Sequence, residues 1–176
     1  MITDYSIIKA DPFLHSGTIA QLATQIWREH YGNLLQERQI DYMLEKFQSE
    51  RAVKVQMEQD GYTYYIIYSN NGGQVRRAIG YMGVKFDDNS LFLSKFYILK
   101  SHRGKGVGRM GFDFLFNEAV NLGAQSVWLT VNRGNTDSIA VYDHLGFVTV
   151  REQVADIGEG FVMDDYIMEK RLVPYE

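Results

Sequence analysis

Several features are missing from this 176-residue chain, and each absence excludes a class of chemistry. There is no cysteine, so disulfides, thiolate metal sites and a cysteine acyl-enzyme are excluded. No apolar run reaches membrane-spanning length, and residues 1–10 lack the pattern of a signal peptide, which favours a cytoplasmic location. The four histidines show no metal-binding spacing such as H-E-x-x-H, so we expect no metal site.

The overall composition is typical of a folded globular protein. Hydrophobic residues make up 45% of the chain and charged residues 23%, which predicts one globular domain over residues 1–176. The formal net charge of −4 weighs against a nucleic-acid partner and is compatible with a cationic substrate. We therefore expect neither a nucleic acid nor a membrane as partner.

The hydrophobic periodicity predicts a mixed α/β order. Two helical faces come early, Ile19–Ile26 after an N-cap at Ser16 or Thr18, and Ile40–Phe47, with Ser49 capping a third helical piece. Strands are expected at 5–9, 62–69, 78–86, 91–99, 126–132, 147–153 and 166–172, and further helices after Val107 and over 137–145. The crossover around residues 91–132 permits locally parallel pairing within an otherwise antiparallel sheet, so the fold class is three-layered α/β.

The segment between the strand at 91–99 and the following helix carries the strongest chemical signal. It reads Arg103-Gly104-Lys105-Gly106-Val107-Gly108-Arg109. Glycines allow successive N–H groups to turn toward one ligand, and a helix N-terminus adds unpaired N–H groups and a favourable dipole for an anion. The spacing fits neither a Walker loop nor a dinucleotide fingerprint. A pyrophosphate clamp of another type remains, beside the plainer alternative of a glycine-rich turn that only packs a helix closely on a sheet.

Arg103-x-x-Gly106-x-Gly108 resembles the signature with which GNAT acetyltransferases hold the pyrophosphate of coenzyme A. Phe96-Tyr97-Ile98, Asn132-x-x-Asn135 and Ala140-Val141-Tyr142-x-x-x-Gly146-Phe147 are similar to further landmarks of that family, in the same order. The resemblance implies a GNAT-like fold with helices on both faces of a mixed sheet and a splayed parallel strand pair. It implies acetyl-CoA as cofactor, held by Tyr97, Ile98, Leu99, Arg103, Gly104, Lys105, Gly106, Val107, Gly108, Arg109 and Asn135, with Tyr142 as the catalytic acid.

The stretch Asp156 to Lys170 is similar to the PaiA-like branch of polyamine acetyltransferases. This resemblance implies direct transfer of an acetyl group to a primary amine of a small molecule, with polyamines favoured. Substrate-side candidates are Trp27, Glu29, Tyr31 and Tyr81, and an acidic set of Asp156, Glu159, Asp164 and Asp165. Asp164 and Asp165 follow a glycine-rich segment, so a turn role is at least as well supported as amine binding.

Several alternatives stay open. Asn135 precedes a helix and suits an N-cap as well as a cofactor contact, and Tyr142 suits a core position on that helix as well as an acid. The strands at 91–99 and 126–132 could form a continuous ladder in place of the splay that would offer backbone groups to the cofactor. A non-catalytic acyl-CoA sensor on the same fold is the competing function, and it would not need Tyr142. The acceptor amine, the general base and the oligomeric state are undetermined, and a homodimer is compatible with the exposed aromatics and strand edges.

Overall fold

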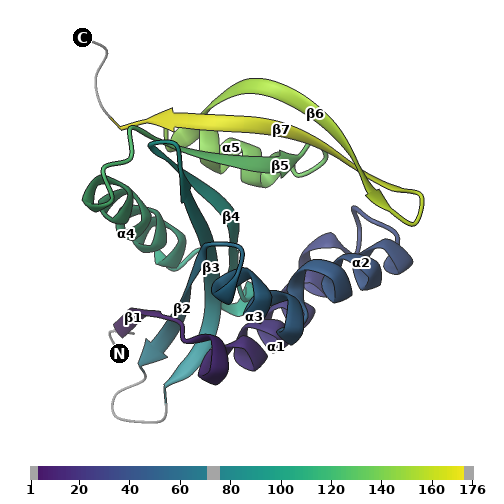
Figure 1. The fold of residues 1–176 in the computed structure, drawn as a ribbon, viewed down its shortest axis with the longest axis horizontal. Coiled ribbons are helices and arrows are strands. Elements are labelled where there is room, and N and C mark those ends of the chain that lie inside the picture. Colours follow the sequence, from purple (N-terminus) through teal and green to yellow (C-terminus); the bar gives the residue numbers. More distant parts are fainter. Residues whose placement is uncertain (1–3, 71–75, 173–176) are drawn as a thin grey trace. The chain divides into compact units, whose positions relative to one another are not determined.

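The computed structural model of the chain describes residues 4–70 and 76–172 (Figure 1). The strands are β1 (Asp4–Lys9), β2 (Tyr62–Asn70), β3 (Arg77–Asp87), β4 (Ser90–Ile98), β5 (Ser126–Asn132), β6 (Val148–Gly158) and β7 (Phe161–Arg171). The helices are α1 (Pro12–Tyr31), α2 (Glu37–Met43), α3 (Glu50–Glu58), α4 (Val107–Asn121) and α5 (Thr136–His144), with a π-helical turn η1 (Leu44–Gln48) and a 3₁₀ turn η2 (Lys100–His102). The alternation of helices and strands confirms the predicted α/β class.

The strands follow the order β1-β2-β3-β4-β5-β7-β6. β1 pairs antiparallel with β2, and β2 with β3. β4 and β5 form the predicted parallel pair, in a register that joins Ser90–Leu93 to Ser126–Leu129 and ends there, although β4 continues to Ile98 and β5 to Asn132. β7 then pairs antiparallel with both β5 and β6. The mixed, mostly antiparallel sheet is therefore confirmed.

The described residues form two compact units. The first comprises those up to Lys85 together with 95–114, and the second comprises 86–94 and those from Leu115 onward. Strand β4 and helix α4 contribute residues to both units. The expectation of a single domain stays a prediction.

In the first unit, helices cover both faces of the strands. Successive residues of β2 point to opposite faces, so Tyr64 donates its hydroxyl to Gln56 of α3 while the ring of Tyr65 packs edge-on against Phe114 of α4, with centroids 4.9 Å apart. α4 lies close to β4 as well, since a Cβ at Gly111 would fall 2.3 Å from the ring of Phe96. The predicted layers of helix, sheet and helix are present within this unit.

Helix α1 begins earlier than predicted. Asp11, not Ser16 or Thr18, is its N-cap, and its Oδ1 accepts the N–H groups of Phe13 (2.8 Å) and Leu14 (3.0 Å). Pro12 occupies the first turn, where its missing N–H costs nothing. Ser16 is instead buried inside the helix. The cap of α3 at Ser49 is confirmed, because its Oγ accepts the N–H of Ala52 at 3.3 Å.

The second unit ends in a longer hairpin than predicted. β6 and β7 each span 11 residues and are joined through Glu159 and Gly160, which both have positive φ angles of 56° and 78°. Asp164 and Asp165 therefore lie inside β7, and their expected role in a turn is wrong.

Among the described residues no helix combines the length and apolar character needed to cross a membrane.

Candidate active site

The glycine-rich loop links η2 to α4 in the first unit. Gly104 and Gly106 have φ angles of +72° and +82°, a region that side chains other than glycine rarely adopt. A Cβ at either position would meet no atom within 4 Å, so open space adjoins the backbone. At the start of α4, the N–H of Met110 donates to the carbonyl of Gly106 at 3.0 Å. The N–H groups of the residues before Met110 have no helical carbonyl four residues earlier to bond to, so they are suited to binding an anion.

The charges around this loop are positive. Arg103, Lys105 and Arg109 are exposed, and Arg103 donates from Nε to the carbonyl of Ile98 at 2.9 Å. Partial burial lowers the pKa of His102, and the charges of Lys105 and Arg77 lower it further. His102 is therefore neutral at physiological pH, and the net field at the loop comes from arginine and lysine.

The end of β4 leads into the loop, but not all of its backbone groups are available to a ligand. The N–H of Leu99 donates to the carbonyl of Ile79 at 2.8 Å, and the carbonyl of Ile98 is the acceptor for Arg103. The backbone of Gly80 also comes close, since a Cβ there would lie 2.6 Å from the carbonyl oxygen of Tyr97. We expected the backbone N–H and carbonyl groups of residues 97–99 to stay unpaired. That expectation is wrong for the N–H of Leu99 and the carbonyl of Ile98, because the chain itself supplies their hydrogen-bond partners.

Three of the four predicted substrate-side residues meet in one aromatic cluster of the first unit. The ring of Tyr97 lies 5.7 Å from Trp27, 6.5 Å from Tyr31 and 5.5 Å from Tyr81, centroid to centroid. Tyr81 is fully buried and donates its hydroxyl to Oε1 of Gln48 at 3.1 Å. Burial raises the pKa of Tyr81 well above its ordinary value. The nearby indole N–H of Trp27 acts in the opposite direction without reaching hydrogen-bond geometry.

Glu29, the fourth predicted substrate-side residue, is exposed and follows Trp27 by two positions in the chain. Its Oε2 accepts the N–H of Lys100 at 3.3 Å, and its Oε1 accepts Nε2 of Gln25 at 3.0 Å. The carboxylate therefore links α1 to the turn η2 that precedes the glycine-rich loop. This contact gives Glu29 a positioning role whatever it does toward a substrate.

A buried polar cluster of the first unit is formed by Lys95 on β4, Gln56 on α3 and Tyr64 on β2. Lys95 is 7% exposed, and its Nζ donates to Oε1 of Gln56 at 2.5 Å and to the hydroxyl oxygen of Tyr64. The Tyr64 hydroxyl donates to the same Oε1 at 2.6 Å. Burial lowers the pKa of Lys95 to about 7. No motif points to this cluster, but the alternation of Leu91, Leu93 and Lys95 does place the lysine at a core position of the strand.

The remaining predicted site residues, Asn135 and Tyr142, belong to the second unit. Asn135 is buried, and its Oδ1 accepts the N–H of Ser138 at 3.4 Å, which confirms the capping interpretation. Tyr142 is half-buried on α5, with its ring 5.9 Å from that of Phe147. The roles of these two residues toward a cofactor stay predictions.

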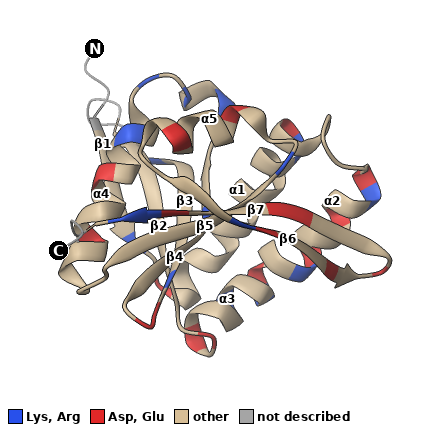
Figure 2. Cartoon of the chain, turned by 90° about the horizontal axis from the view of Figure 1, so that it is seen from above, with Lys and Arg blue, Asp and Glu red and all other residues tan. Residues whose placement is uncertain are grey.

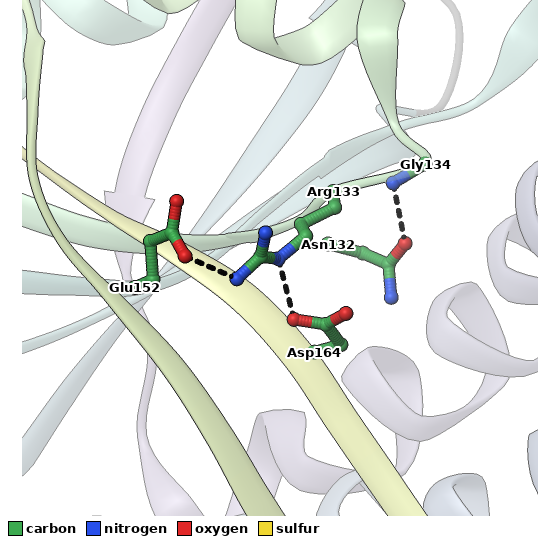
Figure 3. Close-up of polar contacts among 5 residues, drawn as sticks. All are labelled: Asn132, Arg133, Gly134, Glu152 and Asp164. Carbon is green, nitrogen blue, oxygen red and sulfur yellow. Dashed lines mark hydrogen bonds and ion pairs between the residues drawn. The ribbon is translucent and has the colours of Figure 1, made fainter.

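The second unit also contains a surface ion cluster. Arg133 donates from Nε to Asp164 at 2.5 Å and from Nη2 to Glu152 at 2.7 Å, as Figure 3 shows. Asn132 beside it accepts the N–H of Gly134 at 2.9 Å. No group of three histidine, cysteine or carboxylate side chains that could hold a metal ion occurs within residues 4–70 and 76–172.

Comparison with known proteins identifies the family. A family model described as the acetyltransferase (GNAT) family matches residues 19–147, which is well over half of the chain. The chain belongs to the GNAT family. An uncharacterized N-acetyltransferase from Mycobacterium bovis, with counterparts in two strains of Mycobacterium tuberculosis, is 32% identical over 98 residues. That match spans 55% of this chain and 62% of the relative.

Solved structures show the same fold. PaiA N-acetyltransferase from Thermoplasma acidophilum, in complex with coenzyme A, has a TM-score of 0.74 at 19% identity, covering 96% of this GNAT chain and 99% of its own. Spermidine/spermine N-acetyltransferase SpeG from Vibrio cholerae has a TM-score of 0.64 at 15% identity, covering 95% and 93%. At these identities the likeness concerns the fold, so the activity has to be argued from the residues.

Proposed function

We propose that this GNAT protein is an acetyl-CoA-dependent N-acetyltransferase that acts on a primary amine of a small molecule. The observation that carries the proposal is the glycine-rich loop at the start of α4, where positive φ angles, open space and exposed cations combine. Family membership supports it, and so does the PaiA structure, which was solved with coenzyme A.

The loop fits the pyrophosphate of coenzyme A. A diphosphate needs converging N–H donors and nearby cations, and residues 103–109 supply both, with Arg103 held in place by its bond to Ile98. The end of β4 at Tyr97, Ile98 and Leu99 leads directly into this loop and is also proposed to hold the cofactor. Asn135 stays a predicted cofactor-binding residue. When bound, acetyl-CoA supplies the acetyl group as a thioester.

The aromatic cluster supports an amine as acceptor. Faces of tryptophan and tyrosine attract cations, and Trp27, Tyr31, Tyr81 and Tyr97 lie within one cluster. An alkyl amine with a pKa of about 10.4 is protonated at pH 7, and freeing its lone pair costs about 4.6 kcal/mol. Polyamines are the proposed substrate class, in line with the structural likeness to the spermidine/spermine N-acetyltransferase SpeG.

Tyr142 is proposed as the acid that assists the departing thiolate. Complete proton transfer from a phenol of pKa about 10 to a thiolate whose thiol has a pKa of about 8.5 is uphill by roughly 2 kcal/mol. A hydrogen bond that strengthens as charge builds on sulfur is sufficient. This role distinguishes an enzyme from an acyl-CoA sensor, which would need the clamp alone. The cytoplasmic location and a homodimer stay predictions.

Acceptor profiling tests the proposal. Acetyl-CoA is offered with spermidine, spermine, aminoglycosides, amino acids and peptides, and free thiol is followed over time. We expect turnover with at least one polyamine. Binding of acetyl-CoA without turnover on any amine would favour the sensor, and absence of binding would refute the clamp.

A further inference from the structure

Positive charge in the first unit extends beyond the glycine-rich loop. Residues 96–112 contain four lysines and arginines and no carboxylate, and residues 76–85 contain three more, again without a carboxylate. The whole chain, by contrast, has a formal net charge of −4. Figure 2 shows the lysines and arginines in blue and the acids in red. Two segments of this unit are therefore purely basic in a chain that is acidic overall.

The exposed cations of these two segments are not neutralised by the chain. None of them forms an ion pair with a carboxylate at 4.0 Å or less within residues 4–70 and 76–172; they are Arg76, Arg77, Lys100, Arg103, Lys105 and Arg109. Elsewhere the arginines are paired, since Arg28 and Arg133 each bind two carboxylates. Unpaired cations of one sign on one surface attract an anionic ligand.

Arg77 belongs to a different strand from the loop. The N–H of Leu99 donates to the carbonyl of Ile79 at 2.8 Å, so the start of β3 lies beside the end of β4. Arg77 is two residues before Ile79, and the turn η2 begins directly after Leu99. The charges of Lys105 and Arg77 both lower the pKa of His102, the last residue of η2. The start of β3, the turn η2 and the loop therefore share one basic surface.

A diphosphate accounts for only part of this charge. It is proposed to lie at the N–H groups that begin α4, where Arg103, Lys105 and Arg109 surround it. Acetyl-CoA carries a further phosphate on the 3′ oxygen of its ribose, and a phosphate monoester has a charge of about −1.5 to −2 at pH 7. A guanidinium fits such a group well, because two of its N–H donors can bind two phosphate oxygens at once.

We propose that Arg77 binds the 3′-phosphate of acetyl-CoA, so that the protein prefers this cofactor to its 3′-dephospho form. This inference rests on the proposed function, because it requires the diphosphate to occupy the loop. Lys105 supports both phosphate groups, since it belongs to the loop and also acts on His102. Arg77 is thus a specificity-determining residue that lies outside the glycine motif.

The test is a calorimetric comparison of two ligands and three proteins. Wild type should bind acetyl-CoA about ten-fold more tightly than 3′-dephospho-acetyl-CoA. Arg77→Gln should weaken the binding of acetyl-CoA by about ten-fold and change the Kd of the dephospho form by less than about two-fold. Arg51→Gln, which alters an exposed arginine of α3 outside both basic segments, is the matched control and should resemble wild type with both ligands.

The possible failures are distinguishable. Equal Kd values of wild type for the two ligands would overturn the inference and leave the clamp intact. Equal weakening of both ligands by Arg77→Gln would also overturn it, because that result would mean a general effect of charge. Equal Kd values together with binding of inorganic phosphate that depends on Arg77 would indicate a separate anion site and would refute the assignment. If wild type binds neither ligand, the proposed function fails as well.

His102 provides a second measurement that needs no turnover. Its Nδ1 lies 3.0 Å from the hydroxyl oxygen of Ser101, and the charges that act on it are those of Lys105 and Arg77. A phosphate bound at Arg77 adds negative charge, which favours the protonated imidazole. Proton NMR should therefore show the pKa of His102 rising in saturating acetyl-CoA, and rising less in the dephospho form. Equal rises with the two ligands would place the 3′-phosphate away from this turn and contradict the inference.

Discussion

Lys95 offers the sharpest test of the energetics, because a buried ammonium with a lowered pKa makes stability depend on pH. The group has a pKa of about 7 in the folded chain against the ordinary 10.5. Between these values the unfolded chain binds more protons than the folded one, so stability rises with pH. Below pH 7 both states are protonated and the contribution levels off at its least favourable value.

The perturbation is Lys95→Met, which removes the charge and keeps an unbranched side chain of similar length. Gln56 and Tyr64 still bond to each other in the variant, so no buried polar group loses its last partner. For pKa values of about 7 and 10.5, the linkage relation gives wild type about 2 kcal/mol of added stability between pH 7 and pH 9. The variant lacks this contribution, and we expect it to be more stable than wild type at pH 7.

Urea unfolding at pH 7, 8 and 9 measures the effect, with the difference in free energy between wild type and Lys95→Met as the readout. Taking this difference cancels the titration of other groups. Lys9→Met, at an exposed position of β1, is the matched control and should show a flat difference. A difference for Lys95→Met that is also independent of pH would show that Lys95 is not titrating near pH 7, and the reasoning would be refuted.

Three further predictions concern the glycine loop, the proposed acid and the packing of α4. Gly108→Glu should keep the wild-type melting temperature, because a Cβ there meets only Ile98 at 3.9 Å, yet it should weaken acetyl-CoA binding at least ten-fold in calorimetry, because the added charge repels a phosphate. Gly108→Ala is the control, and equal affinity of the two variants for acetyl-CoA would contradict the clamp. Tyr142→Phe should lower kcat by about 10²- to 10³-fold with unchanged acetyl-CoA affinity, and wild-type turnover would make Tyr142 a packing residue. Gly111→Val should destabilise the fold by about 1–3 kcal/mol or more in urea unfolding, because its Cβ would overlap the ring of Phe96; unaltered stability would mean that α4 shifts freely.

The sequence by itself determined the features that depend on a few neighbouring residues. The glycine-rich loop between β4 and α4 was predictable because left-handed backbone at Gly104 and Gly106 is a property of glycine. The cap at Ser49 and the crossover from β4 to β5 followed from local patterns in the same way. Even the missed start of α1 had a local signal, since Asp11 followed by Pro12 is a cap next to a first-turn proline.

Only the tertiary structure decided which polar side chains are buried and which are paired. Asp164 and Asp165 are the same residue type at neighbouring positions, yet Asp164 binds Arg133 at the surface while Asp165 is buried on the other face of the sheet. The cluster of Lys95, Gln56 and Tyr64 joins residues separated by up to 39 positions. Burial and pairing of this kind depend on strand register and on packing between distant segments, and a shift of one residue would reverse every side chain of a strand. That is why family and fold could be argued from local motifs, while the burial and pairing of these polar side chains could be established only from the folded chain.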